Sequence, residues 1–395
     1  MVFRFFLALC LLLSAVGCSS LNRQATTTAP PPELQFTVEA APEWTQLFYR
    51  QSGWFGADGI FSFSLDGVEQ PRNDPQREVL LTFSDTFIGE VEDGKPAEGY
   101  KMANNTVAYL KGQTPHPDSI RFFYKQDEAG QPQTFFVPAN ENAREGQYYW
   151  LGDGFVNREK DNTLYLFAYH IEMTGPNVFD FIEPNVSLLA IPSGSRPPFE
   201  DQRQLITPLH IRNDRLGEGN MGAGVLVNTG WAGAPHPDGY VYVYGCIGQD
   251  KNLIVARVKP RDFENFGRWR YWNGEKWVKD ENAMVPVTNA VSNELSVTPL
   301  EDGRYLLVFQ VLGISDKVGL RIGDSPVGPF GPIQEIWRTP EIDEGLLPYN
   351  AKAHPCLSKP GELLISYNTI TFDFWNDIEK DAHIYRPRFI RLKWK

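Results

Sequence analysis

Four residues whose side chains suit acid–base chemistry stand at matching places along the chain. Each begins a short hydrophobic run that is typical of a β-strand, and a fifth such run begins at a residue without this chemistry. The four are Asp58, Asp153, Glu294 and His354, and the fifth is Ala223. Paired carboxyl groups can protonate a leaving group and activate water, and histidine exchanges protons near neutral pH. If the fold brings these positions together, the sequence predicts an acid–base centre.

The spacing of the five positions indicates the elements that must hold them. Successive separations are 95, 70, 71 and 60 residues, which is about the size of one four-stranded propeller blade. The short β-rich runs are separated by many of the 34 Gly and 30 Pro, and no helical periodicity of helix length is present. We therefore expect an all-β fold, a five-bladed β-propeller that forms one domain over residues 43–395.

Each of the five runs is followed by a second hydrophobic run that can return as its hairpin partner. The residues directly after these second runs are Asp85, Tyr169, Gly245, Gln310 and Asn368. A hairpin places the start of its first strand beside the end of its second. The expected neighbours are Asp58 with Asp85, Glu294 with Gln310, and His354 with Asn368. We expect a binding cleft at this mouth and no comparable set of groups at the opposite mouth.

Aromatic side chains flank the expected mouth. Trp54, Trp150 and Tyr349 each lie a few residues before one of the acid–base positions. Flat apolar rings beside acidic groups suit carbohydrate, because sugar C–H faces stack on the rings while hydroxyls bond to carboxylates and amides. The alternative is that these rings pack in the core of the blades.

The amino terminus is typical of a bacterial lipoprotein signal. Arg4 precedes the apolar run 5–16, and small residues stand directly before Cys18. We expect residues 1–17 to be a signal peptide and residues 18–42 to be a lipidated terminus with a flexible linker. Lipidation of Cys18 would tether the protein to a membrane of the bacterial cell envelope, on its periplasmic or cell-surface face. The alternative is an ordinary secretory signal.

The remaining cysteines and the net charge exclude several classes of protein. Cys246 and Cys356 lie on different strands of the repeat, so we expect free thiols rather than a disulfide. No Cys/His spacing is typical of a zinc site. A net charge of −12 without a basic stripe argues against nucleic-acid binding.

Several motifs carry a resemblance to a known family. They are Trp54-Phe55-Gly56-Ala57-Asp58-Gly59, residues 80–89, Asn104-Asn105-Thr106, Ala351-Lys352-Ala353-His354-Pro355 and Ile365-Ser366-Tyr367-Asn368. The chain resembles the bacterial five-bladed propeller proteins of domains of unknown function 4185 and 5005, which in turn resemble furanosidases such as those of glycoside hydrolase family 43.

The resemblance implies hydrolysis of arabinofuranosyl or related linkages by acidic residues from separate blades. On that pattern Asp58 and Asp153 match the aspartates of the first two blades. His354 matches a histidine near the axis that sometimes holds a calcium ion or its water. The family takes its general-acid glutamate from blade three, where this chain has Ala223. The acid is then Glu294, a loop residue such as Glu218, or absent.

We assign roles on this basis. Asp58 is expected to be the base or nucleophile, Glu294 the acid, and Asp153 a group that orients or tunes them. The expected substrate-binding residues are Trp54, Asp85, Asn105, Trp150, Gln310, His354 and Asn368. An axial Ca²⁺ at His354 is the one cofactor considered, and the protein is expected to be a monomer.

Three alternatives remain open. Each Asp-Gly pair could simply cap a turn where a strand begins. The protein could be a non-catalytic carbohydrate-binding lipoprotein that uses the same aromatic mouth. A polysaccharide lyase would need a His or Tyr base and a cation beside a uronic acid, and an acidic mouth fits this poorly.

Overall fold

The computed structural model describes residues 34–394, and strands make up most of the regular structure in this range. The expectation of an all-β fold is confirmed. The helical segments are short, and they are α1 (Pro42–Leu47), α2 (Phe374–Ile378), η1 (Pro117–Ser119), η2 (Pro260–Asp262), η3 (Phe266–Arg268), η4 (Glu281–Ala283), η5 (Pro340–Glu344) and η6 (Pro355–Leu357). No helix of the described range is long and apolar enough to cross a membrane. The predicted signal peptide and Cys18 lie outside the described residues.

Five sheets each contribute one strand to a central set of strands, and we call them the larger sheets. Sheet one contains β3 (Phe61–Ser64), β4 (Glu78–Phe83), β8 (Thr106–Lys111) and β9 (Ile120–Phe123). Sheet two contains β12 (Tyr148–Asn157), β13 (Thr163–Met173), β15 (Val186–Ile191) and β16 (Arg203–Ile206), with β14 (Phe181–Ile182) paired to β13. Sheet three contains β17 (His210–Asn213), β18 (Gly217–Asn228), β19 (Tyr240–Ile247), β20 (Asn252–Val258), β21 (Arg270–Trp272) and β22 (Trp277–Val278).

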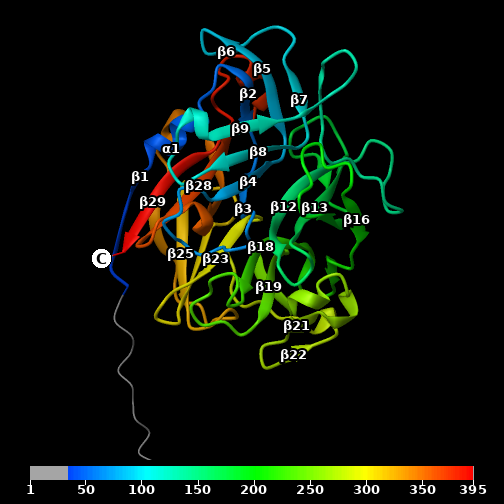
Figure 1. The fold of residues 1–395 in the computed structure, drawn as a ribbon, viewed down its shortest axis with the longest axis vertical. Coiled ribbons are helices and arrows are strands. Elements are labelled where there is room, and N and C mark those ends of the chain that lie inside the picture. Colours follow the sequence, from blue (N-terminus) through cyan, green and yellow to red (C-terminus); the bar gives the residue numbers. More distant parts are fainter. Residues whose placement is uncertain (1–33, 395) are drawn as a thin grey trace, which may run out of the picture. The chain divides into compact units, whose positions relative to one another are not determined.

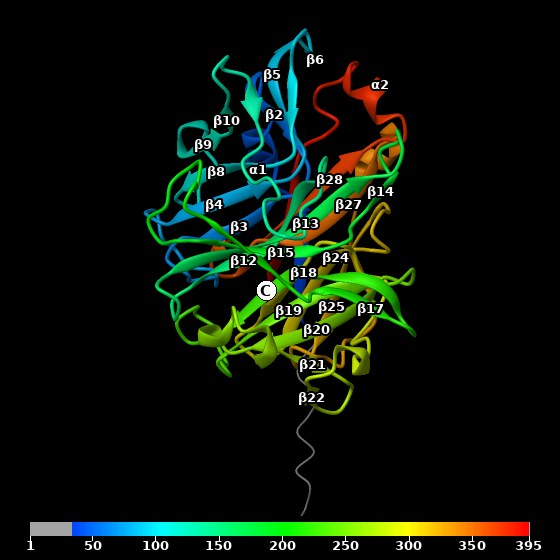
Figure 2. The same ribbon diagram turned by 90° about the vertical axis from the view of Figure 1, so that its right-hand side faces the viewer.

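Sheet four contains β23 (Leu295–Pro299), β24 (Tyr305–Gln310), β25 (Lys317–Gly323) and β26 (Gln334–Arg338). Sheet five contains β27 (Leu347–Ala353), β28 (Glu362–Ile370), β29 (Arg388–Trp394) and β1 (Phe36–Ala40). A further four-stranded sheet is formed by β2 (Ser52–Ala57), β5 (Thr86–Glu92), β6 (Lys95–Pro96) and β7 (Lys101–Ala103), and a two-stranded sheet by β10 (Lys125–Gln126) with β11 (Pro132–Gln133). Figure 2 shows β5 and β6 at the same end of the fold as α2.

One strand of each larger sheet contacts its counterpart in the next. These inner strands are β3, β12, β18, β23 and β27, which contact one another in that order, and η6 contacts β3. Between the sheets lie separate apolar cores, such as the one that joins Phe155 and Phe167 to Val243 and Ile254. Strands such as β15 and β24 are buried along their whole length because both faces of their sheets are covered, which explains their continuous apolar sequences.

The first and last strands of the described chain lie side by side. β1 pairs antiparallel with β29, from Phe36 opposite Trp394 to Ala40 opposite Ile390, and Figure 1 shows them together in blue and red. The compact unit therefore begins at Phe36. β1 precedes the expected domain start at residue 43, and this short strand on a sheet edge, whose residues are exposed or half-buried, carries little hydrophobic signal.

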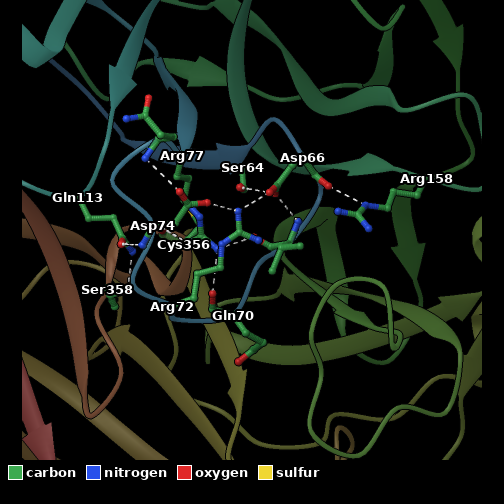
Figure 3. Close-up of polar contacts among 12 residues, drawn as sticks. Ser64, Asp66, Gln70, Arg72, Asp74, Arg77, Gln113, Arg158, Cys356 and Ser358 are labelled. Carbon is green, nitrogen blue, oxygen red and sulfur yellow. Dashed lines mark hydrogen bonds and ion pairs between the residues drawn. The ribbon is translucent and has the colours of Figure 1, made fainter.

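A loop between β3 and β4 covers one end of the inner strands. Its hydrogen bonds reach sheets two, three and five, through Asp66 O with Arg158 Nε, Glu69 N with Ala232 O, and Arg77 Nη1 with Cys356 O. Figure 3 shows the charged side chains of this loop and the nearby Gln113, which donates to Ser358 O. The expectation that the mouth opposite the acidic positions lacks a set of polar groups was wrong.

The bridging role of Arg77 can be tested by substitution. Its guanidinium is buried and donates to the carbonyls of Cys356, Val68 and Gln70. Arg77→Met should lower the free energy of unfolding by roughly 2–4 kcal/mol, because buried carbonyls lose their donors. Denaturant unfolding measures this, with the exposed Lys111→Met as control. An equal, small effect of both substitutions would contradict the bridging role.

Candidate active site

A cavity of about 680 Å³ lies where the inner strands begin. Residues from all five larger sheets or the loops beside them line it, together with α2. The side chains with acid–base chemistry at its surface include Asp58, Asp85 and Glu294, and the aromatic lining includes Trp150 and Tyr349. We call this space the large cavity. Two of the three predicted catalytic residues, Asp58 and Glu294, line the large cavity.

Asp58 lies between β2 and β3 and is held beside Asp85, as predicted. The Asp58 N–H donates to Asp85 O at 2.8 Å, and the Ser84 N–H donates to Asp58 O at 2.9 Å. The carboxylate oxygen Oδ1 accepts from Gly59 N at 2.6 Å and from the Tyr349 hydroxyl at 2.8 Å. Burial raises the pKa of Asp58 above its ordinary value, although these hydrogen bonds act in the opposite direction.

Asp85 faces the same cavity. Its two carboxylate oxygens accept from Asn104 Nδ2 and Trp150 Nε1, each at 3.0 Å. Burial, with a further contribution from the charge of Asp58, raises the pKa of Asp85 to about 7. The Trp150 ring is fixed edge-on against Phe181, with centroids 4.7 Å apart. Trp150 and Asp85 therefore lie where the sequence placed them, as neighbours in one polar and aromatic wall.

Glu294 forms an ion pair with a lysine that the sequence analysis did not consider. The Lys352 ammonium, on β27, contacts Glu294 Oε2, and Asn350 Nδ2 donates to Glu294 Oε1 at 2.9 Å. Lys352 is only 2% exposed and also lies over the ring of Phe61, 3.5 Å from its centroid. Glu294 and Gln310 are neighbours, as expected. The Ser292 hydroxyl links them, because it donates to Glu294 O and accepts from the Gln310 N–H.

Lys352 also links Glu294 to the other two predicted catalytic residues. Burial lowers the pKa of Lys352, and the charges of Asp153 and Asp58 act in the opposite direction. The three carboxyl groups are thus close enough to interact with a single buried ammonium. One signal in the sequence could have found it, a lysine between two alanines in an otherwise apolar strand.

Asp153 faces a second, smaller space rather than the large cavity. This inner cavity of about 50 Å³ lies along all five inner strands and also touches Lys352, Glu69 and His354. The Asp153 carboxylate accepts from Gly154 N at 2.8 Å and Val225 N at 2.6 Å. Burial raises the pKa of Asp153, and burial together with Asp153 raises that of Glu69 to about 8. Asp153 is therefore placed to act on Lys352 rather than on a ligand in the large cavity.

The predicted position of His354 was wrong. Irregular pairing interrupts β12 between Leu151 and Gly154, and it interrupts β27 between Tyr349 and Lys352. Bulges of this kind redirect side chains near functional sites. Asn368 is opposite Tyr349 in the first half of β27 (Leu347–Ala353), whereas His354 follows the end of this strand, where its N–H donates to Leu364 O.

His354 is a hydrogen-bonded core residue. Its ring nitrogens lie 2.9 Å from Ser62 Oγ and 2.7 Å from Ser366 Oγ, and burial lowers its pKa well below the ordinary value. Both ring nitrogens are occupied, so these residues do not fit an axial Ca²⁺. In the described range, no group of three or more His, Cys, Asp or Glu is arranged to hold a metal.

Four other residues expected to bind substrate are instead buried and do not line the large cavity. Trp54 stacks on Phe122 in an apolar core. The others bond to backbone: Asn105 with Phe136 and Tyr149, Gln310 with Ser315, and Asn368 with Ala57. Trp54, Asn105, Gln310 and Asn368 thus position the segments that form the site. Cys246 and Cys356 are free thiols, as predicted.

Glu183 is a further cavity-lining carboxyl group that the sequence analysis missed. Asn220 Nδ2 donates to its Oε2, and burial raises its pKa. Asn220 is itself held by His210, 2.8 Å away. Glu218, considered above as an alternative acid, also lines the cavity but is exposed and pairs with Arg212. No motif marks Glu183, because it stands in a loop outside the repeated strands.

Structural comparison identifies similar folds. A crystal structure of a protein from Bacteroides ovatus ATCC 8483, provisionally described as a hydrolase, superposes with a TM-score of 0.68 at 19% identity, over 92% of this chain and 93% of that one. A glycoside hydrolase family 43 protein of Bacillus licheniformis gives 0.40 at 12% identity, over 85% and 51%. A family 62 hydrolase bound to xylotriose gives 0.43 at 11%, over 88% and 99%.

At 19% identity, the Bacteroides ovatus structure shows that the fold is shared. The other two structures superpose too weakly to support an argument. No curated protein matches this chain. The sequence itself matches one family model over nearly all of the described fold, which confirms part of the resemblance noted above, while the resemblance to domain of unknown function 4185 stays a prediction. Because the match spans residues 42–394, the chain belongs to the family described as domain of unknown function DUF5005.

Proposed function

We propose that the protein is a glycoside hydrolase whose reaction takes place in the large cavity. The observation that carries this proposal is that carboxyl groups in different electrostatic surroundings face one cavity. Glu294 contacts the ammonium of Lys352, whereas no ion pair is formed by Asp58 or Asp85 within the described chain. Glycoside hydrolysis uses one carboxylate and one carboxylic acid on either side of the scissile bond.

This arrangement favours roles opposite to those expected from the sequence. A cation in contact with a carboxylate stabilises its ionised form, so Glu294 suits the base or nucleophile. Asp58 suits the acid, because burial favours its protonated form. Its Oδ1 accepts two hydrogen bonds, and Tyr385 is a further hydrogen-bond partner of the carboxyl group.

Asp85 and Asp153 would then support the pair from opposite sides. The charge of Asp58 raises the pKa of Asp85, and the charge of Asp153, when it is ionised, favours the ammonium form of Lys352 next to Glu294. Trp150 would hold a sugar face while its indole N–H fixes Asp85. The chemistry requires no metal ion in this scheme, since proton transfer uses only side chains of the chain.

Three finer parts of the proposal have separate support, two from the sequence and one from the contacts between strands. The quoted motifs and their resemblance support an arabinofuranosyl or related linkage. The sequence of residues 1–18 supports a lipid anchor at Cys18 in the cell envelope. The order of contacts among the five inner strands supports five blades of a propeller, with β1 completing the last.

The second candidate function is non-catalytic carbohydrate binding. It is favoured by the same ion pair, because a carboxylate already neutralised by Lys352 and bonded by Asn350 would also suit a receptor that must not react. Enzymatic turnover separates the two functions.

Turnover should depend on Asp58 and Glu294 in different ways. We expect the wild-type protein to hydrolyse at least one member of a panel of furanosides and pyranosides. Glu294→Gln should lower kcat/KM for that substrate by roughly 10³-fold or more, whatever the leaving group. Asp58→Asn should lower it comparably for sugar leaving groups and far less for 2,4-dinitrophenyl leaving groups, which need no acid. Reducing-sugar release and dinitrophenolate absorbance measure these rates.

The control is Glu275→Gln, a charge change at an exposed position. If the wild type binds a sugar but hydrolyses no member of the panel, the receptor function replaces the enzyme. If the two variants show identical leaving-group dependence, the assigned roles are incorrect.

The raised pKa of Asp85 predicts a specific dependence of stability on pH. The folded pKa is about 7, and aspartate in an unfolded chain titrates near 4. Between these values the folded state retains a proton that the unfolded state releases, so stability falls as pH rises. Asp85→Asn removes this loss. The free energy of unfolding of the variant minus that of the wild type should therefore increase by on the order of 3 kcal/mol between pH 4 and pH 8.

Urea unfolding at several pH values measures this change, and any constant offset from altered hydrogen bonding does not affect it. Asp118→Asn, at an exposed position, is the matched control. Parallel pH profiles for wild type and Asp85→Asn would show that Asp85 is not protonated in the folded protein at pH 5–6.

A further inference from the structure

The mouth of the large cavity is surrounded by exposed apolar side chains. Six residues both line this cavity and are at least 38% exposed: Met102, Met173, Phe179, Leu312, Ile314 and Trp375. They come from β7, the end of β13 and the loop that follows, the turn after β24, and α2. We call these six residues the apolar rim. Figure 2 shows α2 and β14 on the same side of the fold, and the ring of Phe179 contacts that of Phe372 before α2.

This concentration differs from an ordinary surface. Eleven large hydrophobic side chains are exposed in the described range, and six of them form the apolar rim. Single exposed apolar residues need no explanation, but a contiguous group at the mouth of a cavity marks a binding surface. Trp150 and Tyr148 line the same cavity, so the apolar rim and the residues beside Asp85 enclose one space.

The polarity of the cavity changes from floor to mouth. The floor presents Asp58, Asp85 and Glu294 with Asn350, which suit the hydroxyl groups of a sugar. Four of the six rim residues are aliphatic or thioether side chains: Met102, Met173, Leu312 and Ile314. These offer neither a hydrogen bond nor a flat ring to a second sugar, whereas they match a hydrocarbon chain.

We propose that the cavity takes an amphiphilic glycoside, with the sugar at the floor and an aliphatic aglycone against the apolar rim. This rests on the proposed function for the identity of the polar end. In the hydrolytic step the bond between the anomeric carbon and the aglycone oxygen breaks, Asp58 protonates that oxygen, the hydroxyl of water bonds to the anomeric carbon, and Glu294 accepts the remaining proton of water, which returns to Asp58 through solvent. The products are the free sugar and an aliphatic alcohol.

Binding of matched short-chain and long-chain glycosides tests the apolar rim without requiring turnover. The probes are methyl and n-octyl β-D-glucopyranosides and α-L-arabinofuranosides, used with the full chain below the micelle concentration of each octyl compound. Fluorescence of Trp150 and Trp375, which line the cavity, and isothermal titration calorimetry report binding. Because a fully buried methylene strengthens binding about fourfold, the octyl compounds should bind at least 100-fold more tightly than the methyl compounds.

Variants of the apolar rim should remove this preference. Leu312 is 57% exposed and Ile314 is 45% exposed, so the double variant Leu312→Asn/Ile314→Asn should fold normally and lose at least tenfold in octyl-glycoside affinity. Ile206→Asn, an exposed aliphatic position outside the cavity, is the matched control and should change nothing. Circular dichroism and thermal melting check the fold of each variant.

The outcomes separate this inference from the proposed function. Octyl-glycoside binding that needs the apolar rim, without any hydrolysis, supports the aliphatic site and rejects the enzyme. If sugar substrates are hydrolysed but octyl compounds bind no more tightly than methyl compounds, the aliphatic site is rejected and the proposed enzymatic function is retained. Equal weakening by the rim variant and by Ile206→Asn would show general adsorption of detergent and overturn the inference.

Discussion

The buried ammonium of Lys352 is the interaction on which the rest of the site depends. It contacts Glu294 directly and lies within the electrostatic reach of Asp58 and Asp153. Without a nearby cation, these carboxyl groups could not all be ionised while buried, because the free-energy cost of burying each charge is large. Lys352 contacts and stabilises the carboxylate of Glu294, whereas burial favours the protonated forms of Asp58 and Asp85. The cation thereby creates the difference that acid–base chemistry needs.

The sheets supply the rigidity that such an arrangement requires. The inner strands hold Asp153 and Lys352 by backbone geometry, and interrupted pairing in β12 and β27 turns these side chains toward each other. The loop of residues 65–77 covers the other end of the inner strands through hydrogen bonds to three sheets. A buried ion pair contributes little net stability, but a fixed one can organise a functional site.

Much of this organisation could be predicted from the sequence because it follows from hairpin geometry. The all-β class followed from the short alternating and apolar runs, and the neighbourhood of Asp58 and Asp85 followed from the pairing of two strand ends. His354 was misplaced because it follows the end of β27, which begins at Leu347, and the sequence of this segment does not mark where the strand begins. Trp54 was assigned to the mouth because its position along the chain does not show which face of the strand it occupies. Lys352 and Glu183 were missed because long-range contacts, and not local motifs, give them their roles.

The most direct test of the account is the protonation of individual carboxyl groups in the folded protein. ¹³C-carboxyl NMR of selectively labelled Asp and Glu, assigned with Glu294→Gln and Asp85→Asn, reads each group separately across pH. The account predicts that at pH 5–6 Glu294 gives the signal of a carboxylate while Asp85 gives that of a carboxylic acid. A protonated Glu294 together with an ionised Asp85 at that pH would contradict the central role of Lys352.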